Sequence, residues 1–141
     1  MTRRGRFGMA ISVAILALTI GVSSAFAAVT FSYTSTLSMT SPNYGGPYRT
    51  YSGHHIAIQT TMASSVNGTY TIEVERQDCL LGVCWGTLVG SAGSCPYIGF
   101  CGLSWAIDLG NGQNKFAFYF KKANDGHNIH TNSFQMWSTE P

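Results

Sequence analysis

Charged residues are scarce in this sequence, which has eight lysines and arginines and six aspartates and glutamates among 141 residues. Three of the arginines, Arg3, Arg4 and Arg6, lie at the extreme N-terminus. From residue 28 onward, five basic side chains stand against six acidic ones, a formal charge of −1. Because no basic patch remains to meet phosphates or an anionic membrane surface, the sequence argues against nucleic-acid binding.

The sequence also lacks an apolar run long enough to span a bilayer comfortably. Its main apolar stretch, residues 9–22, follows the N-terminal arginines and precedes the small-x-small motif Ala25-Phe26-Ala27. A basic start, a short apolar segment and a small-residue cleavage site are typical of a secretory signal peptide. A leader of this bacterial type predicts export, with no integral membrane association once it is removed.

We place the cleavage after Ala27, with Ala25 and Ala28 as the alternative positions. This divides the chain into a signal peptide over residues 1–27 and one domain over residues 28–141, a length close to that of the most common domains. We expect this domain to be secreted and extracellular.

Strong helix formers are few, with only three glutamates and three lysines, while tyrosine, phenylalanine, threonine, serine and glycine abound after the leader. This composition suits strands and disfavours helices. Apolar and polar residues alternate most clearly over residues 70–75, 103–109 and 116–121, the period of a half-buried strand. About seven or eight short strands predict a single antiparallel β-sandwich, with a closed β-barrel as the structural alternative. Its predicted core consists of Phe31, Tyr33, Ile56, Ile58, Ile72, Val74, Trp105, Ile107, Phe116, Phe118 and Phe120.

Turn signals separate these strands. Asn-Gly occurs at residues 67–68 and 111–112, and it favours tight hairpins because both residue types tolerate positive φ angles. We therefore expect one hairpin over residues 62–70, and a second in which the 103–109 run pairs with the 116–120 run. A further turn is expected at Asn124-Asp125-Gly126.

Four cysteines follow the leader, and disulfides are the expected state in an exported protein. Of the three possible pairings we favour Cys79–Cys84 and Cys95–Cys101, because each pair brackets a short turn-like segment. Closing such short loops raises the free energy of unfolding by about 2 kcal/mol per bridge. A structural zinc site is the alternative, but the Cys-x4-Cys and Cys-x5-Cys spacings do not match the usual range at both ends.

Residues 41–55 hold two prolines and three glycines, which predicts a loop. Tyrosines supply flat apolar area with a polar tip, so this loop is the predicted ligand-binding surface. The alternative is that its tyrosines pack down onto the end of the sandwich. The residues expected to contact a ligand are Tyr44, Tyr48, Arg49, Tyr51 and His55, beside His54.

The two cysteine loops are both apolar. The first carries Leu80, Leu81, Val83 and Trp85, and the second carries Tyr97, Ile98 and Phe100. If the loops lie together at one end of the sandwich, they form a rigid apolar tip of the kind that contacts a partner or a membrane. The alternative is that they cap the core.

Motifs for catalysis are absent. Glu73 and Glu75 lie two apart on one strand, with Cα atoms about 7 Å apart, which is near the spacing of the carboxylate pair in inverting glycosidases. A solvated strand face explains them better. Because His54 and His55 point to opposite faces of an extended chain, and His127 and His130 need not converge, the histidines predict no metal site.

We therefore predict a non-catalytic secreted binding protein without a metal or cofactor. Its expected partner is an extracellular or cell-surface glycan or protein, bound through the tyrosine loop. A secreted antimicrobial or toxin-like protein that acts on a target cell envelope through the apolar cysteine loops is the alternative.

Overall fold

The computed structural model describes residues 29–107 and 115–139. The predicted signal peptide, its cleavage site and the Asn111-Gly112 turn lie outside these residues. The described part of the chain forms nine strands and no helix, so the all-β prediction is confirmed. It accordingly contains no helix that is long and apolar enough to cross a membrane. The strands are β1 (Val29–Met39), β2 (Asn43–Gly45), β3 (Arg49–Thr50), β4 (His55–Ser64), β5 (Thr69–Leu80), β6 (Val83–Pro96), β7 (Gly99–Ala106), β8 (Lys115–Lys122) and β9 (Ile129–Thr139).

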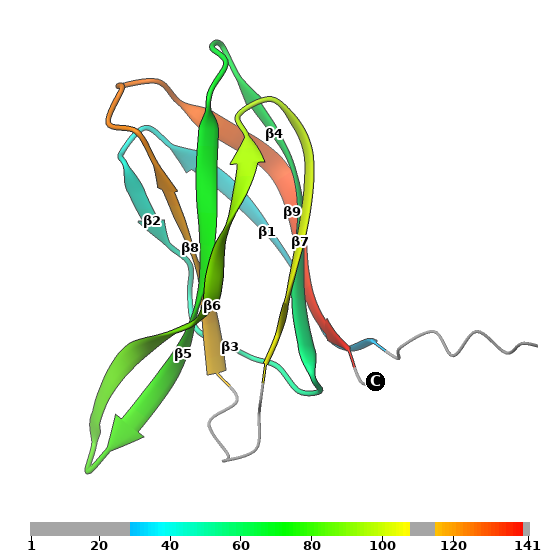
Figure 1. Cartoon of the computed structure of the whole chain (residues 1–141), viewed down its shortest axis with the longest axis vertical. Coiled ribbons are helices and arrows are strands. Elements are labelled where there is room, and N and C mark those ends of the chain that lie inside the picture. Colours follow the sequence, from blue (N-terminus) through cyan, green and yellow to red (C-terminus); the bar gives the residue numbers. More distant parts are fainter. Residues whose placement is uncertain (1–28, 108–114, 140–141) are drawn as a thin grey trace, which may run out of the picture.

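Two antiparallel sheets pack face to face (Figure 1). The four-stranded sheet has the order β1-β9-β4-β7, and the five-stranded sheet has the order β2-β8-β5-β6, with β3 also pairing with β8. Because the sheets are separate, the molecule is a sandwich and the barrel alternative is wrong. Buried side chains from both sheets form one apolar cluster between them.

Nine of the eleven predicted core residues are buried, and the other two lie on β1. Phe31 is 37% exposed, and Tyr33 is half-buried against the edge of the core. The register of β1 against β9 shifts twice, between Val29 and Phe31 and between Ser35 and Leu37. The inward–outward alternation nevertheless persists from Tyr33 to Met39, and exposure rises toward the start of the strand, from 3% at Leu37 to 59% at Val29. Phe31 thus lies where β1 runs past the edge of the core, so its placement in the core was wrong.

Both hairpins predicted from Asn-Gly are wrong. β4 and β7 belong to the four-stranded sheet, whereas β5 and β8 belong to the other. The chain therefore crosses between sheets after β4 and again after β7. The apolar faces of β7 and β8 cover the core from opposite sides, and Ile107 after β7 and Phe116 on β8 are both buried. A hairpin would have placed both apolar faces on the same sheet.

The true hairpin of this region joins β5 and β6, which pair from Thr69 and Pro96 down to Leu80 and Val83. Its two-residue turn is Leu81-Gly82, with φ angles of 50° and 83°. Two positive φ angles in succession are the geometry of the type I′ turn that suits the twist of a hairpin. The region from Gly90 to Gly102, despite its glycines and Pro96, supplies the second half of β6 and the start of β7.

Both predicted disulfides are confirmed. Cys79 and Cys84 face each other across β5 and β6, and Cys95 pairs with Cys101 between β6 and β7. The four sulfur atoms are thereby used in bridges. The alternative of a zinc site built from their thiolates is wrong.

Candidate functional site

Residues 41–55 are not the free loop that we predicted, because they contribute two short strands, β2 and β3, along the edge of β8. Tyr51, expected to contact a ligand, is 1% exposed. Its ring meets Tyr33, Phe116 and Phe118 edge to face, and burial raises its pKa above the ordinary value for tyrosine. A ring enclosed in this way cannot stack on a ligand, so Tyr51 is a core residue.

Tyr44 and Arg49 also turn toward the body of the sandwich. The half-buried ring of Tyr44 lies edge to face with Phe120, with centroids 6.0 Å apart. The guanidinium carbon of Arg49 lies 4.9 Å from the centre of the Tyr33 ring. Tyr33 in turn donates its hydroxyl to the carbonyl of Thr50. These contacts close the side of the sandwich between β1 and β3, as the packing alternative expected.

His54 and His55 are exposed at the start of β4, beside Ala106 and Ile107 in a shallow hollow. His130 lies in a different hollow, between β1 and β9, near Ser38 and Asn128. The structure therefore does not bring these histidines together. In residues 29–107 and 115–139, no three His, Cys, Asp or Glu side chains are grouped to hold a metal ion.

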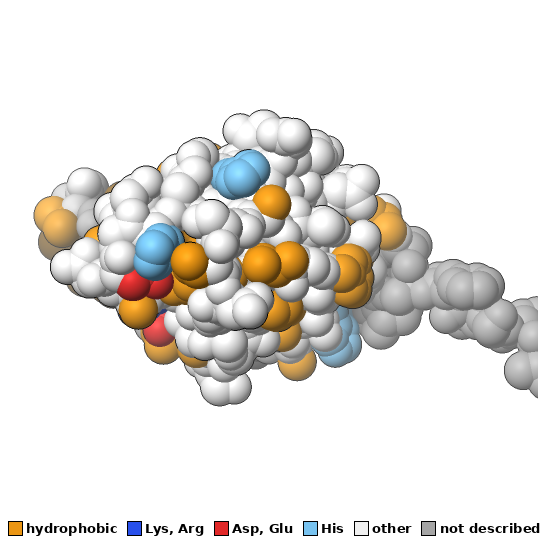
Figure 2. Space-filling view, turned by 90° about the horizontal axis from the view of Figure 1, so that it is seen from above, with side chains coloured by type: hydrophobic (Ala, Val, Ile, Leu, Met, Phe, Trp, Pro, Cys, Tyr) orange, Lys and Arg blue, Asp and Glu red, His pale blue; other side chains and the backbone are white. Residues whose placement is uncertain are grey.

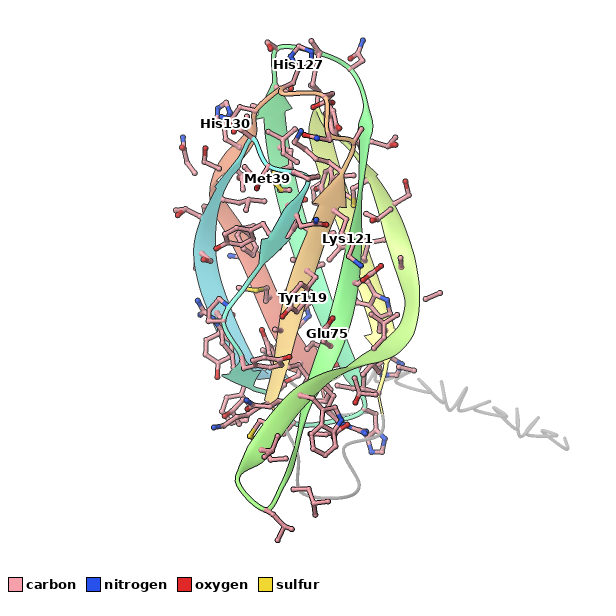
Figure 3. All side chains as sticks on the ribbon, turned by 90° about the vertical axis from the view of Figure 1, so that its left-hand side faces the viewer. Met39, Glu75, Tyr119, Lys121, His127 and His130 are labelled. Atoms are coloured by element: carbon pink, nitrogen blue, oxygen red, sulfur yellow. A yellow bond between two sulfur atoms is a disulfide. The ribbon has the colours of Figure 1, made fainter. Side chains whose placement is uncertain are left out.

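Tyr48 alone among the predicted tyrosines reaches the outer face of the five-stranded sheet. There it joins Glu73 and Glu75 of β5 and Tyr119 and Lys121 of β8, and we call these five residues the outer-face cluster. Strand alternation explains the direction of the four members on β5 and β8, because Ile72, Val74, Phe118 and Phe120 point into the core and their neighbours point away from it. Figure 3 shows Lys121, Tyr119 and Glu75 along this face.

Two polar contacts organise the outer-face cluster. Tyr48 donates its hydroxyl to Oε2 of Glu75 over 3.3 Å, and Nζ of Lys121 donates to Oε2 of Glu73 over 2.5 Å. Burial, together with hydrogen bonds to Tyr119 and Glu75, raises the pKa of Tyr48 above its ordinary value. The hydroxyl therefore keeps its proton and remains a donor across the physiological pH range.

Two glycines give the outer-face cluster its space. A Cβ atom at Gly45, which pairs with Tyr119, would lie 2.7 Å from Cε1 of that ring. A Cβ atom at Gly86 would lie 2.6 Å from the Tyr48 hydroxyl and would also collide with the Glu75 carboxylate. Bare backbone on β2 and β6 thus gives room to the Tyr119 ring, the Tyr48 hydroxyl and the Glu75 carboxylate.

The outer-face cluster has the groups of a binding surface rather than those of a hydrolase. Glu73 and Glu75 leave the same strand in the same direction, and Lys121 neutralises the first of them. A glycosidase places its two carboxylates on either side of the scissile bond. Phenolic rings, carboxylates and an ammonium on the face of a sheet can instead stack on a ligand and exchange hydrogen bonds with it.

Sequence reasoning missed Tyr119 and Lys121 as members of a site. Their signal was present, because both lie on the polar side of the alternating run 116–121. Their proximity to Glu73 depends on the register of β8 against β5, in which Tyr119 lies opposite Glu73 and Lys121 lies opposite Thr71. No feature of the sequence fixed that pairing.

The two cysteine loops do not form one apolar tip. Cys95 lies opposite Tyr70 and Cys84 lies opposite Cys79, nine residues farther along β5, which is about 30 Å at the rise of a strand. The loops therefore lie at opposite ends of the sandwich (Figure 1). Figure 2, which views the end near Cys95, shows hydrophobic side chains only in small groups separated by polar and backbone atoms. The expectation of a combined tip is wrong.

Comparison with protein-family models, curated proteins and solved structures finds no match for this chain. The residues themselves are therefore the guide to its function.

Proposed function

We propose that this protein is a secreted, non-catalytic binding protein that recognises an extracellular or cell-surface glycan through the outer-face cluster. The observation that carries the proposal is the contact of Tyr48 with Glu75 beside Tyr119, next to two glycines whose bare backbone gives these groups room. A sugar ring presents an apolar side for stacking and hydroxyls for hydrogen bonds. The cluster offers both complements, with phenolic rings beside carboxylate acceptors and a lysine donor.

A non-catalytic role fits the arrangement of the acids. Glu73 is committed to Lys121 over 2.5 Å, and Glu75 accepts the hydroxyl of Tyr48 over 3.3 Å. Both partners lie beside the acids on the open face of a sheet, which leaves no pair of carboxylates facing each other across a substrate.

Export is part of the same proposal. The N-terminal leader has the features of a signal peptide, and both bridges belong to an oxidising compartment rather than to the cytoplasm of an ordinary cell. A glycan outside the cell is the partner that such a protein would meet.

The proposal is tested by retention of the purified mature protein on insoluble chitin, cellulose and bacterial cell wall. We expect retention on at least one of them. Replacing Tyr48 and Tyr119 together with alanine should weaken retention by more than about tenfold, because each aromatic contact contributes about 1 kcal/mol beyond the area that it buries. Phe100→Ala is the matched control, since Phe100 is an aromatic side chain 62% exposed on the other sheet.

Three results would contradict the proposal. Equal losses for Phe100→Ala and the double variant would mean that retention reflects general hydrophobicity. Release of soluble sugar by the wild type, abolished by Glu73→Gln with Glu75→Gln in a folded protein, would reveal a hydrolase. Failure to bind any of the three polymers, together with growth inhibition of neighbouring bacteria, would favour the antimicrobial alternative.

A further inference from the structure

The hairpin of β5 and β6 continues beyond the sandwich. β5 pairs with β8 only from Tyr70 to Arg76, whereas it pairs with β6 as far as Leu80. Beyond Arg76 the two strands therefore form a free ribbon, which Figures 1 and 3 show projecting from the end of the molecule. The bridge between Cys79 and Cys84 ties the ribbon together next to its turn.

The end of this ribbon is apolar and exposed. Leu80, Leu81, Val83 and Trp85 have exposed fractions of 63%, 96%, 66% and 48%. Leu80 lies opposite Val83, and Trp85 lies opposite Asp78 two residue pairs back, on the same face of the ribbon. We call Leu80, Leu81, Val83 and Trp85 the ribbon tip. It forms a convex apolar knob instead of packing against the core.

The turn residue Leu81 has a positive φ of 50°, a conformation that bulky side chains seldom adopt. Asparagine before Gly82 would suit a type I′ turn better. The turn thus carries an exposed leucine in an unfavourable conformation, at a cost to both solubility and turn preference. Such a local cost points to a role for the side chain itself.

Polar groups mark where the apolar part of the ribbon ends. Asp78 accepts hydrogen bonds from Arg76 over 2.8 Å and from Thr87 over 2.6 Å. The Asp78–Trp85 pair lies three residues from the turn, about 10 Å along a strand. This matches the depth of about 5–10 Å to which interfacial segments enter the boundary between lipid headgroups and acyl chains. Tryptophan at that level is typical of membrane interfaces.

The ribbon suits shallow insertion for two more reasons. Among the described strands, none besides β5 and β6 pairs with the ribbon beyond Arg76, and unpaired outward backbone groups are not tolerated deep in hydrocarbon. The ribbon tip also offers only four side chains, whereas a stable protein interface engages about 20–30 residues on each side. A lipid surface therefore fits the ribbon tip better than a protein partner does.

We infer that the ribbon tip inserts into the interfacial layer of a lipid bilayer and holds the protein at a membrane surface. No charged residue lies between Asp78 and Asp108, and Asp78 is paired with Arg76. The attraction is accordingly hydrophobic, so zwitterionic phosphatidylcholine is a sufficient partner and added salt weakens it little. This surface is separate from the outer-face cluster and adds to the proposed function.

The test is cosedimentation of the mature, oxidised protein with phosphatidylcholine vesicles. Leu81→Asn removes the most exposed side chain and installs Asn-Gly, so it preserves or improves the turn. We expect it to lower partitioning by about tenfold or more, the loss that corresponds to withdrawing one leucine from an apolar environment. Leu88→Asn is the matched control, because Leu88 is 52% exposed on the same hairpin but lies opposite Glu75, behind the ribbon tip.

Trp85 provides a second readout. Its fluorescence should shift to the blue when vesicles are added, and Trp85→Phe should abolish the shift while leaving the signals of the other two tryptophans. Three results would overturn the inference: no partitioning of the wild type, equal losses for Leu81→Asn and Leu88→Asn, or binding of the ribbon tip to a protein without any affinity for lipid. Retention on glycans should be unchanged in Leu81→Asn, so this inference and the proposed function can fail independently.

Discussion

Tyr48 and Tyr51 lie three residues apart, but they serve different surfaces. Tyr51 is enclosed by three aromatic rings of the core, whereas Tyr48 reaches outward to Glu75. We expect Tyr51→Ala to lower the free energy of unfolding by about 3–5 kcal/mol, the usual cost of emptying an aromatic core site. Tyr48→Ala should cost about 1 kcal/mol. Urea unfolding followed by circular dichroism measures both.

Tyr51→Phe is the control for the first variant, since it keeps the ring and should retain most of the stability. If Tyr48→Ala proved as destabilising as Tyr51→Ala, Tyr48 would be a core residue and the outer-face cluster would lose its first member.

Asp125 links stability to acid pH. The fully buried ammonium of Lys122 lies 2.6 Å from its Oδ1, and this contact, with the backbone N–H of His127, lowers the pKa of Asp125 to about 2. An unfolded aspartate titrates near pH ~3.9. A lowered pKa stabilises the fold above the unfolded value, and that contribution is lost as pH falls from about 4 toward 2.

We therefore expect the urea midpoint of the wild type to fall between pH 5 and pH 2. In Asp125→Asn this fall should be shallower, although it should not vanish, because Arg76 and Thr87 also lower the pKa of Asp78. An identical pH profile for the variant and the wild type would show that the pair of Lys122 and Asp125 does not couple folding to protonation.

The two disulfides have similar loop lengths but different surroundings. Cys95 is 1% exposed within the core, whereas Cys84 is exposed near the end of the ribbon. Replacing Cys95 and Cys101 with alanine should cost about 2 kcal/mol for the lost loop constraint, plus the effect of a core cavity. Replacing Cys79 and Cys84 should change the melting temperature less, because the ribbon can fray while the sandwich stays folded.

Scanning calorimetry of the two double variants separates these cases. Equal losses of melting temperature would mean that the ribbon folds cooperatively with the sandwich rather than as an extension of it.

At the scale of elements, the sequence predicted the strands better than their partners. Alternation located β5, β7 and β8, because each has one wet and one buried face. It predicted only a short strand from Trp85 to Val89 in place of the whole of β6, because the glycines at 90 and 93 hide the alternation beyond it. The Asn-Gly signals were read as hairpins, but turn chemistry is local, whereas the choice of sheet depends on which side of the core an apolar face covers.

The candidate site was predictable only in part, for the same reason. The tyrosine-rich segment was visible in the sequence, and so were Glu73 and Glu75. That Tyr48 would turn outward while Tyr51 turned inward depends on how β2 and β3 lie along β8. The membership of Tyr119 in the outer-face cluster depends on the register between β8 and β5. Both are long-range arrangements that no short motif encodes.

For the whole molecule, export and oxidation make a joint prediction about mass. The protein recovered from the medium should begin at Ala28, and its intact mass should be that of residues 28–141 less four hydrogens for the two bridges. Intact-mass spectrometry with and without a reductant measures both quantities. A secreted form that retained the leader or free thiols would contradict the expected processing or compartment.

β9 lies between β1 and β4, so the four-stranded sheet depends on a strand that follows the other eight described strands in the sequence. Among the described strands, β1 pairs only with β9, which joins it to the rest of its sheet. Because the ribosome works from the N-terminus, β9 emerges after all the strands that it holds together, and this sheet cannot close before then. A premature stop codon shortly before Ile129 would remove the strand between β1 and β4 and leave β1 without its partner.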